Sequence, residues 1–273
     1  MKEEKIPEGW KEELLVNLIE APESGARPKG GASTESGTVP SIGAEFITSD
    51  GRLQFDGMKY IPEKFYSEMN SGKLKIGDLL ICKDGALTGK VAYYDRDYYP
   101  KAAVNEHVFI IRPKNGAVAK FIFYVLQSLS GQAQLKNIMT GSAQPGINTQ
   151  FPKYFSLREP PRKEQKKIAE ILTTVDKDIE ETDLLIEKYE RLKKSLLRTL
   201  LTKGIGAKKY QKVEVKRSRY EELPAHWEWT TLGMHTTPVS GSTPSKRIPE
   251  FYKGHVPWIT TVDLNYGIIT KPT

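Results

Sequence analysis

The chain has 273 residues, of which 38% are hydrophobic and 27% charged, a balance typical of a soluble globular protein with one large or two smaller domains. No apolar run reaches about 18 residues, which excludes an ordinary membrane-spanning helix. Cys82 is the only cysteine, so an internal disulfide and a cysteine-based zinc site are also excluded. The N-terminal MKEEKIPEGW lacks an apolar signal core, and we expect a cytoplasmic protein.

Residues 1–160 predict a mixed α/β globular domain within an α+β chain. Short β-rich runs such as LLICK, KVAYY and HVFIIRP alternate with Gly, Pro and Asn turns. One helical stretch, AKFIFYVLQSLSGQAQLKNI, interrupts them. Because strands and turns dominate on both sides of that stretch, we expect a sheet-based core with a helix packed against it.

The stretch DGALTGKVAYY, residues 84–94, has some features of a phosphate-binding loop. Only three residues separate Gly85 from Gly89, however, and Val91 follows Lys90 where Ser or Thr would bind magnesium. A strand-like run also follows Lys90, whereas a phosphate-binding loop opens a helix. We therefore predict a β-hairpin instead of a nucleotide site.

Residues 161–203 predict one long helix. No Gly or Pro occurs between Arg162 and Lys203, two prolines precede this run and Gly204 follows it. About 40 residues at 1.5 Å each span about 60 Å, which exceeds one compact domain. A heptad seam with steps of three and four residues is formed by Ile168, Leu172, Val175, Ile179, Thr182, Ile186, Tyr189, Lys193, Leu196 and Leu200. This seam needs a partner helix in this chain or another; a single helix packed along its own domain is the alternative.

The net charge of +7 is concentrated around this helix. Residues 161–219 hold 17 Lys and Arg against 10 Asp and Glu, whereas the rest of the chain holds 24 of each. The density is highest in TKGIGAKKYQKVEVKRSR, and we interpret residues 204–222 as a basic linker. Such a run suits a polyanion such as DNA, but a solvated linker explains the charge equally well.

An internal repeat follows the linker. Pro7 matches Pro224 and Trp10 matches Trp227 at an offset of 217 residues. SGARP (24–28) matches SGSTP (240–244) at an offset of 216, and VPSI (39–42) matches VPWI (256–259) at 217. Three blocks in one order with nearly constant offset predict that residues 223–273 are the incomplete start of a second copy of the 1–160 domain.

Two tandem α/β domains separated by long helices resemble the specificity (S) subunits of type I restriction-modification systems. The segment LREPPRKEQKKIAEILTTVDKDIE is similar to the conserved region of that family, and IPEGWK to its domain start. SGSTPSKRIPEFYKGHVPWITTVDL is similar to its domain-opening block, and GDLLICKDGALTGKVAYY and VNEHVFIIRP to its interior strands. The resemblance covers essentially the whole chain, although the first opening block lacks the FYKG-type segment of the second.

The resemblance implies a DNA-binding function without catalysis. Residues 1–160 would be a target-recognition domain that reads half of a bipartite site in double-stranded DNA, and the helix would be a spacer. Methyltransferase (modification) subunits would dock and methylate adenine, and a restriction subunit would join them. S-adenosylmethionine, ATP and Mg are expected on those partners, with no cofactor in this chain.

A half-length chain could pair with a second copy through an antiparallel arrangement of its 168–200 helix. A truncated, inactive fragment is one alternative. A coiled-coil adaptor whose α/β domain binds protein instead of DNA is the other.

Searches for catalytic motifs support a non-catalytic chain. No Asn-Pro-Pro-aromatic run occurs, and the four histidines show no metal-ligand spacing. Glu164-Gln165-Lys166 has the acid-x-Lys pattern of some nucleases but lies at the predicted helix start, where Glu is favoured. His107 follows Glu106 in VNEHVFII, and we interpret it as a hydrogen-bonded histidine on a strand.

Three loops carry the residue types that contact DNA bases and phosphates. Arg27 and Lys29 lie in SGARPKGGAST, and Lys83, Thr88 and Lys90 in CKDGALTGK. The loop MTGSAQPGINTQ, residues 139–150, adds amide and hydroxyl groups from Ser142, Gln144, Asn148 and Gln150. An ordinary surface loop is the alternative for this last segment, and solvated hairpin lysines are the alternative for Lys83 and Lys90.

Overall fold

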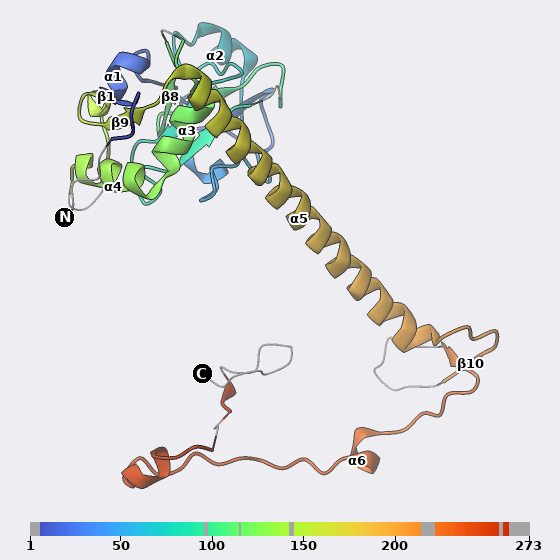
Figure 1. Ribbon diagram of the computed structural model, residues 1–273. Coiled ribbons are helices and arrows are strands. Elements are labelled where there is room, and N and C mark those ends of the chain that lie inside the picture. Colours follow the sequence, from blue (N-terminus) through green and yellow to red (C-terminus); the bar gives the residue numbers. More distant parts are fainter. Residues whose placement is uncertain are drawn as a thin grey trace. The chain divides into compact units, whose positions relative to one another are not determined.

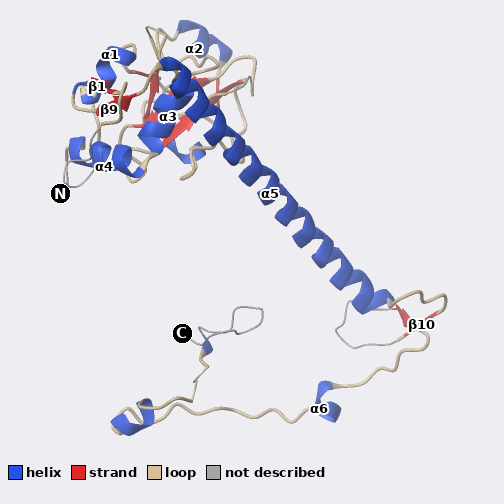
Figure 2. Cartoon of the chain, in the orientation of Figure 1, coloured by secondary structure: helices blue, strands red, loops and turns tan. Residues whose placement is uncertain are grey.

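The computed structural model describes residues 6–95, 98–114, 116–141, 145–213, 222–256 and 259–261. The chain divides into two units, residues 1–188 and 189–273, whose helices and strands are shown in Figures 1 and 2. In the described ranges, no helix is long and apolar enough to cross a membrane.

The first unit is built on three small sheets. The largest is antiparallel and has the strand order β2 (Glu23–Ser24), β8 (Val108–Ile111), β5 (Leu79–Cys82), β6 (Val91–Tyr93). In a three-stranded sheet, a central strand pairs antiparallel on one side and parallel on the other, in the order β4 (Tyr60–Ile61), β3 (Val39–Ile42), β7 (Ala103–Val104). The third sheet pairs the two ends of the domain, β1 (Lys11–Leu14) with β9 (Ser156–Glu159).

Strands β5 and β8 form the centre of the core. All their residues are buried, as expected for apolar runs covered on both faces of a sheet. Alternate side chains enter different clusters: Leu79 and Ile81 pack with the helical side, whereas Leu80 and Cys82 pack toward Ile42 and its neighbours. The mixed α+β fold predicted from the sequence is confirmed.

The predicted hairpin is also confirmed. β5 and β6 pair antiparallel, with Leu79 opposite Tyr93 and Ile81 opposite Val91. Gly85 and Gly89 in the connecting turn have φ angles of +81° and +87°, a region that side chains with a Cβ rarely occupy. The turn therefore returns the chain to the sheet, and no helix follows Lys90.

The single helical stretch predicted near residues 119–138 is wrong in one respect, because it forms two helices. These are α3 (Ala119–Gln127) and α4 (Leu129–Ile138). Ser128 lies between them in an extended conformation and accepts a hydrogen bond from Gly131 N at 3.1 Å, which makes it the N-cap of α4. The chain bends so sharply that a Cβ on Gly131 would lie 2.0 Å from Val125 O.

Shorter helical segments complete the first unit. They are α1 (Leu15–Leu18), α2 (Glu63–Glu68), and the 3-10 helices η1 (Ala44–Phe46) and η2 (Phe151–Lys153).

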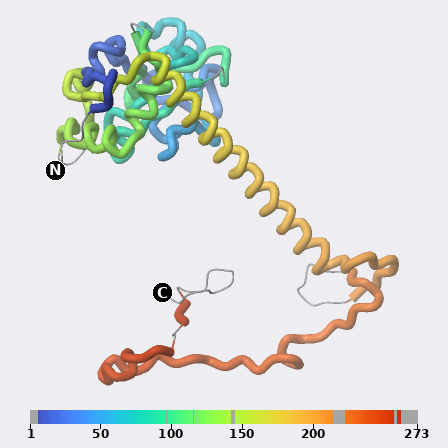
Figure 3. The backbone as a smooth tube through the Cα atoms, in the orientation of Figure 1, coloured from blue at the N-terminus to red at the C-terminus, as the bar shows by residue number. Residues whose placement is uncertain are grey.

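The long helix is confirmed as α5 (Arg162–Lys203), a continuous coil in Figure 3. It begins directly after Pro161, whose carbonyl accepts from the amides of Glu164 and Gln165. It ends at Gly204, where φ is +67°. Of its residues, Gln165 and Ala169 are buried, whereas the seam residues Leu172, Val175, Ile179 and Ile186 are 38–51% exposed. Packing against the first unit therefore covers the beginning of α5, where the seam residue Ile168 lies against the apolar core, and leaves the seam open from Leu172 onward.

The second unit contains short elements. β10 (Tyr210–Lys212), inside the predicted linker, pairs antiparallel with β11 (Glu222–Pro224). α6 (Leu232–His235) and the 3-10 helix η3 (Pro249–Tyr252) follow.

Two local features of the second unit match the first at the repeat offset. Trp227 N donates to Pro224 O at 2.9 Å, as Trp10 N donates to Pro7 O at 3.1 Å. α6 begins and ends 217 residues after α1. These features support a second domain start, which stays a prediction.

Candidate nucleic-acid interface

Two of the three predicted loops meet just beyond the end of β5. Lys83 N donates to His107 O at 2.9 Å, and Lys83 O accepts from Ile147 N at 2.7 Å. The next residue, Asp84, forms an isolated β-bridge with Gly146. The hairpin loop thus lies between the turn before β8 and the segment at 145–147, although 62 residues separate Asp84 from Gly146 in the sequence.

Thr88 fastens these two loops together. Its hydroxyl lies 2.6 Å from Gly85 O and 2.8 Å from Pro145 O, close enough to donate its proton to either carbonyl. Gly146 allows the close approach, because a Cβ there would lie 3.3 Å from Lys83 O. The hydroxyl of Thr88 is therefore already used to set the shape of the surface.

Arg27 brings the first loop to the same place. Its Nε donates to both carboxylate oxygens of Glu106, at 2.7 and 2.8 Å, and its Nη2 contacts Glu106 as well. Nη2 also lies 3.3 Å from His107 Nε2, and His107 Nδ1 lies 2.6 Å from Asp84 Oδ1. Because the Asp84 carboxylate accepts from Nδ1, a neutral His107 has its bare Nε2 facing Arg27.

The Glu106 carboxylate stays charged at neutral pH. Partial burial acts to raise the pKa of Glu106, but hydrogen bonds and charge from Arg27 outweigh it and leave that pKa below its ordinary value. The side chains of Arg27, Glu106, His107 and Asp84 are 36–43% exposed. This cluster, the Arg27–Glu106–His107–Asp84 cluster, therefore presents both hydrogen-bond donors and acceptors to solvent.

The remaining predicted residues lie on the same loops. Lys29 and Gln150 are exposed, and Lys90 is half-buried. The Lys83 ammonium is 5.3 Å from the centre of the Phe109 ring, which holds it over the end of β8. Asn148 Oδ1 accepts from Gln150 N at 2.9 Å, so the amide group of Asn148 shapes its own turn.

Ser142 and Gln144, also predicted to contact DNA, lie outside the described residues.

Three members of the cluster were not predicted from the sequence as site residues: Asp84, Glu106 and His107. His107 was placed on a strand, and this is wrong, because it lies in the turn between β7 and β8. Its amide donates to Asn105 Oδ1 at 2.9 Å, which stabilises that turn. The expectation that its ring is hydrogen-bonded is confirmed. The Asn-Glu-His sequence between two apolar runs was the available signal, because Asn favours such turns.

Among the residues that the structure describes, no group of three or more His, Cys, Asp or Glu side chains is arranged to hold a metal ion.

Comparison with known proteins places the chain in a family. Residues 7–188, more than half of the chain, match the family model of the type I restriction modification DNA specificity domain. A Methanocaldococcus jannaschii protein assigned as the type I restriction enzyme MjaX specificity subunit is 27% identical over 234 residues, which cover 84% of this chain and 53% of that protein. The type I restriction enzyme MjaVIII specificity subunit of the same organism is 26% identical over 212 residues, covering 75% and 48%.

The fold has a solved counterpart. The crystal structure of a type I restriction-modification S subunit from M. genitalium matches 72% of this chain and 47% of its own, with a TM-score of 0.51 and 16% identity. The chain spans about half the length of the curated relatives it matches. From the match over residues 7–188, this chain belongs to the type I restriction-modification DNA specificity domain family.

Proposed function

We propose that this protein recognises one half of a bipartite DNA site as the non-catalytic specificity subunit of a type I restriction-modification complex. The observation that carries the proposal is the meeting of the three predicted loops at one end of the central sheet, through Arg27, Lys83 and Gly146. Family membership supports the same function.

The chemistry of this surface suits base reading. Each base pair presents its own pattern of donors and acceptors in the major groove, so a reader needs both kinds of group. Arg27 supplies donors, whereas Asp84 and Glu106 supply acceptors that suit cytosine amino groups. Lys29 and Lys90 add positive charge for phosphate oxygens, which position a protein on DNA without selecting a sequence.

The open seam of α5 supports pairing with a second copy. Antiparallel pairing centred on residue 184 would place Ile168 opposite Leu200, and Leu172 opposite Leu196, of the second copy. Charge favours this direction over a parallel one: residues 176–183, with five acidic groups and one Lys, would face residues 185–192, which hold two acidic and two basic groups. A parallel pair would place like charges side by side.

A homodimer would present two recognition domains with a spacer between them. Methyltransferase subunits would dock on it and methylate adenine with S-adenosylmethionine. A restriction subunit would add the ATP- and Mg-dependent steps. These partners supply the chemistry, and this chain supplies the choice of sequence.

Methylome sequencing of cells that express this protein with its methyltransferase tests the proposal. A palindromic bipartite adenine motif is expected from a homodimer of half-length chains. An asymmetric motif would show that a second, different recognition domain takes part. The absence of any new motif, when the same methyltransferase is active with another specificity subunit, would contradict DNA recognition by this chain.

A further inference from the structure

Two of the attachments of helix α5 to the first unit lie far apart along the helix. The first is its root, where Gln165 and Ala169 are buried and Trp10 Nε1 donates to Glu164 Oε2 at 3.2 Å. The second is an ion pair four turns later, in which Arg52 Nη2 lies 2.9 Å from Asp183 Oδ2. The two attachments fix different points along one rigid helix, and together they define its direction.

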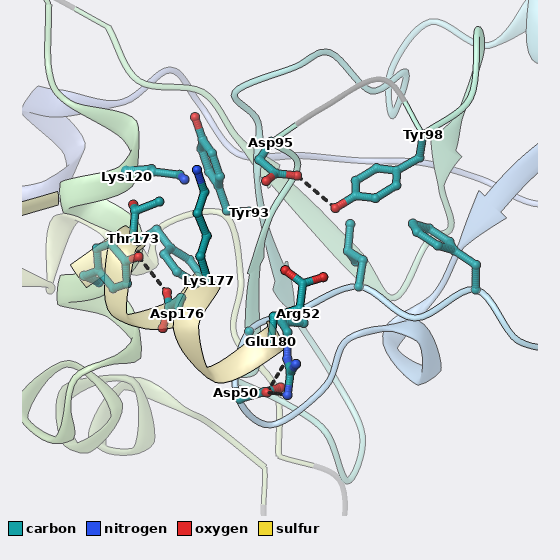
Figure 4. Close-up of a pocket in the computed structure, with 15 residues that line it drawn as sticks. Asp50, Arg52, Tyr93, Asp95, Tyr98, Lys120, Thr173, Asp176, Lys177 and Glu180 are labelled. Atoms are coloured by element: carbon teal, nitrogen blue, oxygen red, sulfur yellow. Dashed lines mark hydrogen bonds and ion pairs between the residues drawn. The ribbon is translucent and has the colours of Figure 1, made fainter. Parts of the chain in front are cut away.

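Between these attachments the helix is not packed tightly against the domain. A cavity of about 590 Å³ lies there, lined on one side by Thr173, Lys177 and Glu180 of α5 and on the other by Tyr93 and Lys120, as Figure 4 shows. Close packing of apolar side chains therefore does not fix the position of α5 along this stretch.

One polar bridge crosses beside the cavity. Tyr124 Oη donates to Asp176 Oδ2 at 2.6 Å and lies 3.2 Å from Thr173 Oγ1. Together with the ion pair at Asp183, this bridge holds the helix at its angle.

Arg52 is also held in position by contacts within its own turn. Its Nε donates to Asp50 Oδ2 at 2.5 Å, and its amide donates to Thr48 Oγ1 at 2.9 Å. The turn that carries it is packed against α3, since a Cβ on Gly51 would lie 2.7 Å from Phe123 Cζ. These contacts fix the position of the guanidinium that pairs with Asp183. We call this ion pair the Arg52–Asp183 strut.

We propose that the Arg52–Asp183 strut, assisted by Tyr124, sets the angle at which α5 leaves the domain and so fixes the number of base pairs between the two half-sites. This inference rests on the proposed function and on antiparallel pairing of α5. Ala169 and Asp183 are about 21 Å apart along the helix. The centre of the proposed pair, residue 184, lies beside the strut, so a shift at the strut passes directly to the second copy.

A small shift at the strut is enough to change the spacing between the half-sites by one base pair. If the strut is lost and each helix shifts by about 2 Å at Asp183, the two domains move by about 4 Å relative to each other. DNA rises about 3.4 Å per base pair, so this movement corresponds to about one base pair. The half-site sequences are read by the loops of the candidate interface and would not change.

The test combines Asp183→Ala with Tyr124→Phe in the full chain, with Asp178→Ala as the matched control on the same helix. The complex with its methyltransferase is offered duplexes that differ only in the spacer length between the half-sites. The double variant is expected to methylate the native spacer and spacers one base pair shorter or longer. The control and Asp183→Glu, which keeps the carboxylate, are expected to accept the native spacer alone.

A distance measurement tests the effect of the strut on the helix angle independently of DNA methylation. Spin labels are attached at Lys136→Cys on α4 and Lys188→Cys on α5, and the labelled protein is diluted with unlabelled protein. Cys82 is fully buried, and burial raises the pKa of its thiol to about 12, so it stays unlabelled. The distance distribution is expected to broaden in the double variant and to stay narrow in Asp178→Ala.

Two outcomes would overturn the inference: an unchanged distance distribution in the double variant, or a broadened distribution with an unchanged spacer preference. A native complex that methylates none of the duplexes would instead refute the proposed function, while the spin-label distances would still test the strut.

Discussion

Replacing Glu106 with glutamine tests whether Arg27 is held in place to read a base. In the structure, Arg27 Nε donates to both carboxylate oxygens of Glu106. Glutamine keeps the length of the side chain and one acceptor oxygen, but it removes the charge and the second acceptor. Arg27 would then lose its fixed orientation while it keeps its own charge. The change should therefore affect how the protein discriminates among sequences more than how it folds.

The expected magnitudes follow from exposure. The Arg27 and Glu106 side chains are 39% and 36% exposed, so solvent screens the pair and its loss should lower the free energy of unfolding by only about 0.2–1 kcal/mol. A well-placed bidentate arginine contributes about 1–3 kcal/mol of discrimination between bases. Since about 1.4 kcal/mol is tenfold in affinity, the ratio of cognate to random-duplex affinity should fall about tenfold. Affinity for random duplex should rise slightly, because one negative charge is removed.

The assay measures dissociation constants for a cognate and a scrambled duplex at several salt concentrations, after the motif is known from methylome data. Glu35→Gln is the matched control, because Glu35 is exposed on the same domain and the charge change is identical. The control should leave the ratio of the two affinities unchanged. If Glu106→Gln weakens binding to both duplexes equally, the ratio of the two affinities stays as in the native protein. That result would refute a role of Glu106 in positioning Arg27.

Three further predictions test the interface, the fold and the pairing. Lys90→Ala should weaken binding to all duplexes alike and reduce the slope of log affinity against log salt by about 1, as measured by salt titration. Gly131→Ala should lower the free energy of unfolding by about 1–3 kcal/mol in denaturant titration, because its Cβ would lie 2.0 Å from Val125 O. Ile179→Glu should convert a dimer into a monomer in light scattering, because a charge would enter the seam.

Each of these predictions has a control that separates it from a general effect. A sequence-selective loss in Lys90→Ala would contradict a phosphate contact. Gly233→Ala, in a short helix with open space around it, should leave stability nearly unchanged. Ser195→Glu adds the same charge to α5 away from the seam and should remain dimeric. Dimerisation of both glutamate variants would show that the seam does not hold the pair.

The sequence predicted the elements that depend on neighbouring residues. The long helix followed from a heptad pattern without Gly or Pro, and its observed bounds, Arg162–Lys203, agree with the prediction to within one residue. The hairpin followed from the apolar runs on either side of Gly85 and Gly89. The break at Ser128 was missed although its signal is local, because the apolar periodicity of α3 obscured the Ser N-cap three residues before Gly131.

The candidate site depended on contacts that no local pattern records. Arg27 and Glu106 are 79 residues apart in the chain, and Tyr124 and Asp176 are 52 apart. Residue type identified Arg27 as a candidate, but only the fold shows that Glu106 and His107 hold its guanidinium. The same holds for Thr88, which was predicted as a DNA contact and whose hydroxyl faces the carbonyl of Pro145.

The second unit shows most clearly which elements depend on neighbouring residues and which depend on residues far away in the sequence. The turn at Pro224–Trp227 and the helix α6 match the turn at Pro7–Trp10 and the helix α1 at the repeat offset, because hydrogen bonds within a few residues suffice to form them. β1 does not have such a match: residues 228–231 are described and form no strand. β1 exists because β9, about 145 residues later, supplies its hydrogen-bond partners, and a two-stranded pair needs both strands. A local pattern is therefore enough to predict a turn or a short helix, whereas a strand such as β1 depends on a partner strand that lies far away in the sequence.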